Sequence, residues 1–193
     1  SSRVYPVEHE RCSTYLVSAE GHPSRWFSSN VRKVLVRGIL DHMGDMKLKS
    51  SAFKEGDLIP RKHTCDGEDV NPMLEVRNLP HEALSLALTV DDPDATRGTA
   101  WDHWLVWNIP AATQYIAEDT LPPDAVQGVN TWGKVKWSGP CPPEGAPPHR
   151  YVFMVYALDV KLDLALGSTK EQLFAAMEGH VLGRAELVGK YGR

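Results

Sequence analysis

The chain has 193 residues, of which 42% are hydrophobic and 24% are charged, and its formal net charge at pH 7 is −4. This length accommodates one domain with an extension, or two very small domains. No apolar run approaches the ~18 residues of a membrane-spanning helix, which excludes an integral membrane protein of the helical kind. The negative charge disfavours nucleic-acid binding through a basic face and stable adhesion to anionic membranes.

Three cysteines are present, Cys12, Cys65 and Cys141. A small secreted domain held together by disulfides has more cysteines and usually an even number. The first 22 residues are polar and lack the apolar core of a signal peptide. We therefore expect a cytoplasmic protein.

The sequence changes character near Met46, and residues 1–45 show no sustained strand pattern. Within this N-terminal extension, apolar residues of the segment 28–43 follow helical spacing, which predicts a short amphipathic helix. The extension is either a dimerisation or docking arm, or non-native sequence upstream of a natural start at Met46. We favour the second interpretation because the segment brings no chemistry with it. The folded domain is expected to span 46–193.

From Met46 onwards the pattern is typical of β-strands. Weak alternation covers 47–53, and clear strands are expected over 84–90 and 101–109. The segment 150–160 is apolar on both faces, which predicts a central strand covered on both sides. Proline-rich segments at 121–124 and 138–148 are expected to be loops, since proline cannot donate to a strand ladder.

One helix is signalled near the C-terminus. Ser168 and Glu171 have the spacing of a capping box, with Ser168 as N-cap. The expected buried stripe of this helix consists of Leu173, Phe174, Met177 and Val181. Residues 185–193 predict a short strand and a tail. Strands followed by a late helix indicate a mostly β, α+β domain with antiparallel strands.

Polar residues occur where these strands end. Asp91, Asp92 and Asp94 follow the strand 84–90, where carboxylates often serve only as turn formers. By strand parity His103 shares a face with Trp101, together with Leu105, Trp107 and Ile109. Such a histidine is usually a core residue. His149 and Tyr151 share a face where the proline-rich loop enters the strand at 150–160, and Tyr151 alone would be a core residue.

Taken together, these groups suit a small anion. Two imidazoles, a phenol and loop backbone N–H groups are donors for an oxyanion. A neighbouring aspartate can fix the tautomer of an imidazole and raise its pKa. The combination predicts a pocket for phosphate, carboxylate or sulfate.

Four short motifs contain these residues. They are Asp91-Asp92-Pro93-Asp94-Ala95, Trp101-Asp102-His103-Trp104, Gly139-Pro140-Cys141-Pro142-Pro143 and His149-Arg150-Tyr151, supported by 64–72 and 180–183. Each motif alone is weak, whereas the set in this order over 46–193 is specific. The set resembles the phosphatidylethanolamine-binding protein family, also called Raf kinase inhibitor-like, and within it the bacterial and archaeal branch.

The resemblance implies an antiparallel β-sandwich with peripheral helices and one anion pocket. It also implies a non-enzymatic binding protein that regulates a kinase or a protease. A homodimer is among the partners that we consider. The pocket residues that it implies are Asp92, Asp94, Trp101, His103, His149 and Tyr151, with Ser138, Gly139 and Pro140 as a wall. Two positions depart from the family pattern: Thr96 replaces a proline, and Asp102 stands where animal members often have a histidine.

Two other functions use the same side chains. A hydrolase would employ them as acid, base and orienting groups, with Ser138 or Cys141 as nucleophile, but neither lies in a G-x-S-x-G setting. A zinc site would use the two histidines and two aspartates, but their spacing is not that of metal ligands. We expect neither a cofactor nor a metal.

The family pattern also implies that Cys65 and Cys141 lie in loops on the pocket side. They can form a disulfide on oxidation, leaving Cys12 alone, or stay as unpaired thiols. We favour unpaired thiols because the cytoplasm is reducing.

Overall fold

A computed structural model of the chain describes residues 45–95, 98 and 100–193. Of the expected extension 1–45, only Asp45 is among the described residues. The expected helix over 28–43 and Thr96 lie outside them. No helix within the described part of the chain is long and apolar enough to cross a membrane.

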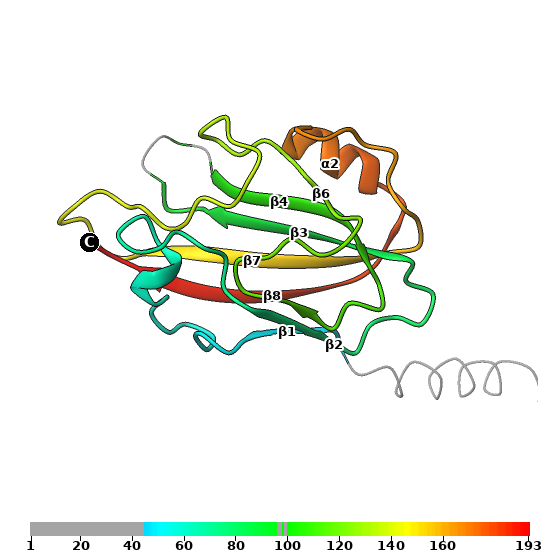
Figure 1. Cartoon of the computed structure of the whole chain (residues 1–193), viewed down its shortest axis with the longest axis horizontal. Coiled ribbons are helices and arrows are strands. Elements are labelled where there is room, and N and C mark those ends of the chain that lie inside the picture. Colours follow the sequence, from blue (N-terminus) through cyan, green and yellow to red (C-terminus); the bar gives the residue numbers. More distant parts are fainter. Residues whose placement is uncertain (1–44, 96–97, 99) are drawn as a thin grey trace, which may run out of the picture. The chain divides into compact units, whose positions relative to one another are not determined.

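The described chain forms two antiparallel sheets and one α-helix (Figure 1). The smaller sheet has the order β1-β2-β5, and the larger has the order β6-β4-β3-β7-β8. The strands are β1 Lys47–Ser50, β2 Leu74–Arg77, β3 Ser85–Asp92, β4 Trp101–Pro110, β5 Tyr115–Ile116, β6 Val126–Gln127, β7 His149–Leu158 and β8 Val181–Tyr191. The helix α2 spans Lys170–Met177, and a 3₁₀ turn, η1, spans Arg61–His63. The predicted mostly antiparallel β-fold is therefore confirmed.

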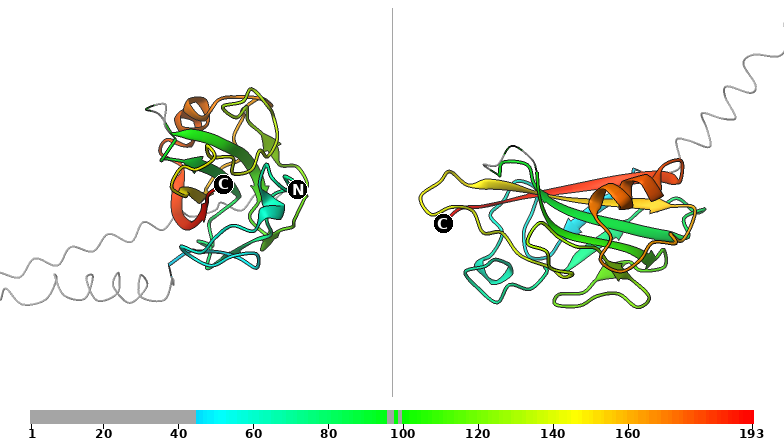
Figure 2. Two further views of the ribbon diagram at one scale, coloured as in Figure 1. Left: turned by 90° about the vertical axis from the view of Figure 1, so that its left-hand side faces the viewer. Right: turned by 90° about the horizontal axis from the view of Figure 1, so that it is seen from above.

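Two apolar clusters hold these layers together. The larger one joins the two sheets, with Leu48, Leu74 and Ile116 from the small sheet against Leu88 and Phe153 of the large sheet. The smaller one joins the other face of the large sheet to α2. The turned views show α2 lying over this face (Figure 2). Burying apolar side chains on both faces is what keeps β3 and β7 at the centre of the large sheet.

Strand β4 departs from simple alternation. Val90 pairs with Trp104 and Asp91 pairs with Asp102, so His103 is an extra residue in β4. Such a β-bulge reverses the facing of the residues beyond it. Leu105 and Trp107 consequently pack towards α2, while Trp104 packs between the sheets. The expectation that His103, Leu105 and Trp107 share one face is wrong for this reason.

The C-terminal elements also differ from expectation. Thr169, and not Ser168, is the N-cap of α2, and its capping-box partner is Gln172. Leu173 and Met177 are buried as expected, whereas Phe174 and Val181 are 39% and 44% exposed. The helix stops at Met177 because Gly179 has a φ of 79°, a left-handed conformation that ends helices.

The last strand is longer than the short strand and tail expected over 185–193. Strand β8 spans Val181–Tyr191 and pairs with β7 along its length, from Leu158–Val181 to His149–Tyr191. This pairing brings the C-terminus beside the loop that precedes β7 (Figure 1).

Candidate functional site

A cavity of about 160 Å³ lies where β3 ends and where β4 and β7 begin. Antiparallel pairing explains this convergence, because Asp92 pairs with Trp101 and Asp91 pairs with Val152. The lining residues are Asp92, Ala95, Trp101, His103, Trp132, Cys141, Pro142, Pro143 and His149. Four of the residues named from sequence, Asp92, Trp101, His103 and His149, therefore meet at one cavity.

Asp92 and His149 form a buried pair in the cavity wall. His149 Nδ1 donates to Asp92 Oδ2 at 2.8 Å, and the two residues are 7% and 4% exposed. The backbone N–H of Asp94 donates to Asp92 Oδ1 at 2.9 Å. The carboxylate is thus held on both oxygens, and it orients the His149 ring so that Nε2 remains for other partners.

His103 is held in the same way by a backbone carbonyl. Its Nδ1 lies 2.6 Å from the Ser138 carbonyl oxygen, so Nδ1 carries the proton. Burial lowers the pKa of His103 below its usual value, although the Ser138 carbonyl and the Asp92 charge act in the opposite direction. The ring is therefore neutral at pH 7, and its Nε2 is an acceptor.

Aromatic rings surround His103. The Trp132 and Tyr151 rings lie edge-on to it, with centroids 4.9 and 5.1 Å away. Trp101 and Trp132 contact one another at 5.2 Å, and Trp132 is 39% exposed. One rim of the cavity is thus an exposed indole next to a buried imidazole.

The phosphatidylethanolamine-binding protein family model matches residues 49–192. The chain belongs to this family.

Known relatives agree with the assignment. A UPF0098 protein of Methanothermobacter thermautotrophicus is 48% identical over 153 residues, which cover 77% of this chain and 99% of the relative. The crystal structure of the phosphatidylethanolamine-binding protein homolog CT736 from Chlamydia trachomatis matches with a TM-score of 0.73 at 43% identity, covering 77% of this chain and 98% of that one. The structure of E. coli YbcL matches with a TM-score of 0.73 at 32% identity, covering 78% and 99%.

Two of the residues that the sequence predicted for the pocket, Tyr151 and Asp94, do not line the cavity. The Tyr151 hydroxyl is buried and has no well-aligned hydrogen-bond partner among the described residues. Burial, followed by the nearby Asp92 carboxylate, raises the pKa of Tyr151. Asp94 accepts hydrogen bonds from the backbone and guanidinium of Arg150 at 2.7–2.9 Å. The hydrogen bonds from the guanidinium are the main reason that the pKa of Asp94 falls to about 2. Asp94 therefore anchors the loop to β7 and does not line the cavity.

Ser138, Gly139 and Pro140 support the wall from behind. The Ser138 carbonyl binds His103, and the Gly139 N–H donates to Asp69 Oδ1 at 2.6 Å. The Pro140 carbonyl accepts from the Cys65 N–H at 3.1 Å. The next residues of the loop, Cys141 to Pro143, form the wall itself.

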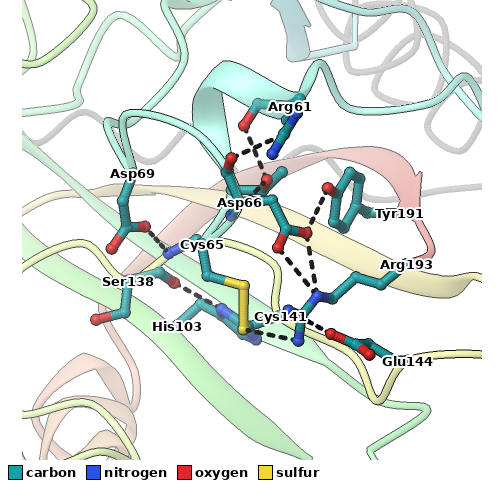
Figure 3. Close-up of a disulfide and its surroundings, with 12 residues drawn as sticks. Arg61, Cys65, Asp66, Asp69, His103, Ser138, Cys141, Glu144, Tyr191 and Arg193 are labelled. Atoms are coloured by element: carbon teal, nitrogen blue, oxygen red, sulfur yellow. Dashed lines mark hydrogen bonds and ion pairs between the residues drawn. A yellow bond between two sulfur atoms is a disulfide. The ribbon is translucent and has the colours of Figure 1, made fainter.

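Cys65 and Cys141 form a disulfide with Cα atoms 5.4 Å apart (Figure 3). The expectation of two unpaired thiols is wrong, because the fold brings the turn after η1 against the loop before β7. That expectation rested on the rarity of disulfides in reducing compartments.

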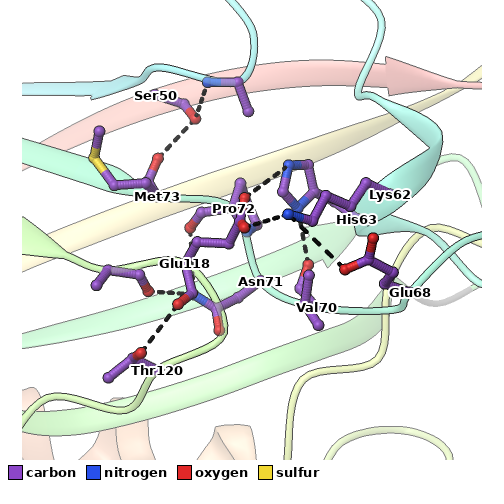
Figure 4. A network of polar contacts seen from close by, with 12 residues as sticks. Ser50, Lys62, His63, Glu68, Val70, Asn71, Pro72, Met73, Glu118 and Thr120 are labelled. Carbon is purple, nitrogen blue, oxygen red and sulfur yellow. Dashed lines mark hydrogen bonds and ion pairs between the residues drawn. The ribbon is translucent and has the colours of Figure 1, made fainter.

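A second polar cluster holds the segment that carries Cys65 (Figure 4). Buried His63 has its Nδ1 3.0 Å from the Val70 carbonyl oxygen and its Nε2 3.8 Å from Glu118 Oε2. Lys62 pairs with the same Glu118. These contacts join the turn at 61–70 to a distant loop and thereby fix the position of Cys65.

The pocket residues named from sequence do not include Trp132, and Pro142 and Pro143 appear only as part of a family motif. Trp132, Pro142 and Pro143 line the cavity from loops, whose positions follow no periodic pattern. Asp102, one of the two departures from the family pattern, binds Lys170 at 2.9 Å on the α2 face of the sheet. Asp102 raises the pKa of His103 least among the groups that act on it.

Proposed function

We propose that the cavity binds the head of a small oxyanion, a phosphate monoester or a carboxylate, without transforming it. The observation that carries the proposal is that His103 and His149 line one cavity while their Nδ1 atoms are already bound by the protein. The two Nε2 atoms are then the ring nitrogens that a ligand engages.

Cavity size limits the ligand. Sites for drug-sized molecules occupy roughly 300–1,000 Å³, whereas this cavity has about 160 Å³. It has room for the anionic head alone. The rest of the ligand, such as a lipid tail, a nucleoside or a phosphorylated side chain, would lie outside, beside the exposed Trp132 at the rim.

Charge limits the ligand further. Among the described residues, those that line the cavity include the Asp92 carboxylate and no lysine or arginine. A neutral imidazole protonated at Nδ1 offers an acceptor at Nε2, not a donor. At the neutral His103 ring the bound anion must therefore carry a proton of its own, as a phosphate monoester does near its second pKa of about 6, or this ring must take up a proton when the anion binds.

The two residues considered as nucleophiles for a hydrolase, Cys141 and Ser138, are not available to attack a ligand in the cavity, and this favours binding without reaction. Cys141 lines the cavity with its sulfur in the disulfide, and Ser138 is not among the lining residues. Within the described residues, no three His, Cys, Asp or Glu side chains are grouped so that they could hold a metal ion. Regulation of a kinase or a protease, which the family resemblance implies, stays a prediction.

Calorimetric titration of the full chain with inorganic phosphate tests the proposal. Wild type should bind, and His103→Ala and His149→Ala should each abolish binding while the thermal unfolding transition persists. His180→Ala is the matched control, because His180 pairs with Asp159 at 2.8 Å on the exposed surface, as His149 pairs with Asp92 in the cavity. Unchanged binding in both cavity variants would refute the proposal.

A further inference from the structure

The cavity has two walls of different origin. Asp92, Trp101, His103 and His149 belong to strands of the central sheet, which are held by ladders of hydrogen bonds. The opposite wall, Cys141 to Pro143, belongs to the loop that connects β6 to β7. The position of this loop wall relative to the strands decides whether the cavity is closed.

The loop wall makes more hydrogen bonds to the rest of the domain before Cys141 than directly after it, where Pro142 is buried without an N–H group. Up to Pro140 it is clamped by backbone contacts, since Gly139 packs directly on the His63 carbonyl and donates to Asp69. Beyond Cys141, Pro142 and Pro143 have no N–H group to donate. The next hydrogen bonds to the rest of the domain run to the C-terminal Arg193, from the Gly145 N–H at 3.1 Å and to Glu144 at 3.3 Å.

Exposed contacts of this kind hold a loop weakly, because water competes for them and salt screens them. The disulfide between Cys141 and Cys65 is therefore the strong restraint on the cavity-lining residues. Cys65 in turn sits in a turn fixed by the His63 and Glu118 cluster. The proline-rich loop wall is thus cross-linked at Cys141 to the turn at 61–70.

The same disulfide is accessible to reductants. Cys65 and Cys141 are both exposed, and Arg193 Nη1 lies 3.8 Å from Cys141 Sγ (Figure 3). A guanidinium next to a sulfur stabilises the thiolate form, and a stabilised thiolate is the better leaving group in thiol–disulfide exchange. The geometry favours attack at Cys65 with departure of Cys141.

We propose that the Cys65–Cys141 disulfide is a redox modification site whose reduction by a dithiol releases the loop wall and weakens anion binding. A thiolate of the dithiol attacks Cys65 Sγ, the Cys65–Cys141 bond breaks, and its electron pair leaves on Cys141 Sγ as a thiolate. The second thiol of the reagent then closes its own disulfide and frees Cys65, so that one disulfide is reduced and one dithiol is oxidised. The effect on affinity rests on the proposed anion site, whereas the release of the wall does not.

The test uses the full chain carrying Cys12→Ser, so that the pair supplies every thiol. Phosphate affinity is measured by calorimetry before and after treatment with dithiothreitol, which is uncharged and does not compete for an anion site. Amide hydrogen exchange at Gly145 and Ala146 is followed in the same samples without phosphate. Cys65→Ser is the matched variant, because it removes the cross-link and leaves the lining residue Cys141 in place.

Reduction should weaken phosphate binding at least about fivefold, the lower end of typical coupling between sites, and should accelerate exchange at Gly145 and Ala146. Cys65→Ser should match the reduced protein and should not respond to dithiothreitol. Unchanged exchange on reduction overturns the proposal, and so does equal phosphate affinity of the two forms. If the oxidised protein binds no phosphate but exchange still accelerates, the anion site fails and the redox control of the wall stands.

Discussion

The carboxylate of Asp92 and the imidazole of His149 lie 2.8 Å apart inside the domain, although 57 residues separate them in the chain. Removing the Asp92 carboxylate leaves the buried His149 Nδ1–H without its acceptor, at a cost of about 1–3 kcal/mol. We therefore expect Asp92→Ala to lower the free energy of unfolding by roughly that amount in urea denaturation. Asp159→Ala removes the exposed partner of His180 and should change it by less than about 1 kcal/mol. Equal effects of the two variants would contradict a structural role for the buried pair.

Anion affinity should rise as pH falls. The pKa of His103 lies below its usual value of 6.5 because the ring is buried, so the ring is neutral at pH 7.5 and becomes a donor only at lower pH. Sulfate does not titrate in this range and isolates the contribution of the His103 ring. Its affinity should increase between pH 7.5 and 5.5, by up to about tenfold per pH unit for each proton taken up.

In His103→Ala, sulfate binding should be lost across this range. If the sulfate affinity of the wild type is constant with pH, protonation of the His103 ring plays no part in anion binding, and the prediction is wrong.

Asp91, on the α2 face of the sheet, should make the free energy of unfolding depend on pH. Lys170 Nζ lies 2.7 Å from Asp91 and 2.9 Å from Asp102, yet burial raises the pKa of Asp91 to about 6 from 3.8. A raised pKa in the folded state contributes stability below pH 3.8 that is lost as pH rises through 6. Asp91→Asn cannot ionise, so it should be more stable than wild type at pH 7.5, by roughly 3 kcal/mol at most.

That advantage should disappear at pH 4, as measured by urea unfolding at the two pH values. Lys170→Met is the contrasting variant, because it leaves Asp91 and Asp102 without a cation. It should be destabilised at pH 7.5 and recover at pH 4. A destabilised Asp91→Asn at pH 7.5 would mean that attraction to Lys170 outweighs the burial of Asp91.

Gly139 lies where two segments cross behind the cavity. A Cβ there would collide with the His63 carbonyl oxygen and would stand 2.8 Å from Asp69 Oδ1. Because backbone atoms cannot yield as a flexible side chain does, Gly139→Ala should cost about 1–3 kcal/mol or more and weaken phosphate binding. Gly192→Ala is the control, since its nearest neighbour would be Pro148 at 3.1 Å. Equal thermal unfolding temperatures of the two variants would argue against the close crossing.

The strand ends were the part of the site that could be inferred from sequence. Alternating apolar residues locate β3 and β4. The cavity residues inferred from sequence lie at or near the ends of strands, and they are Asp92, Trp101, His103 and His149. In an antiparallel sheet the end of one strand lies beside the start of the next, so these residues gather without further information. Asp94 and Tyr151 satisfied the same pattern, but their contacts turn them into supports of the cavity.

The sequence by itself determined the β-rich fold and the strand-borne half of the cavity, because periodicity and strand pairing act over a few neighbouring residues. Only the tertiary structure decided the bulge at His103, the Cys65–Cys141 disulfide and the wall formed by Trp132 and Pro142. Each of these depends on which distant loops come into contact. Loop positions follow the packing of the whole domain, and local residue patterns do not encode them.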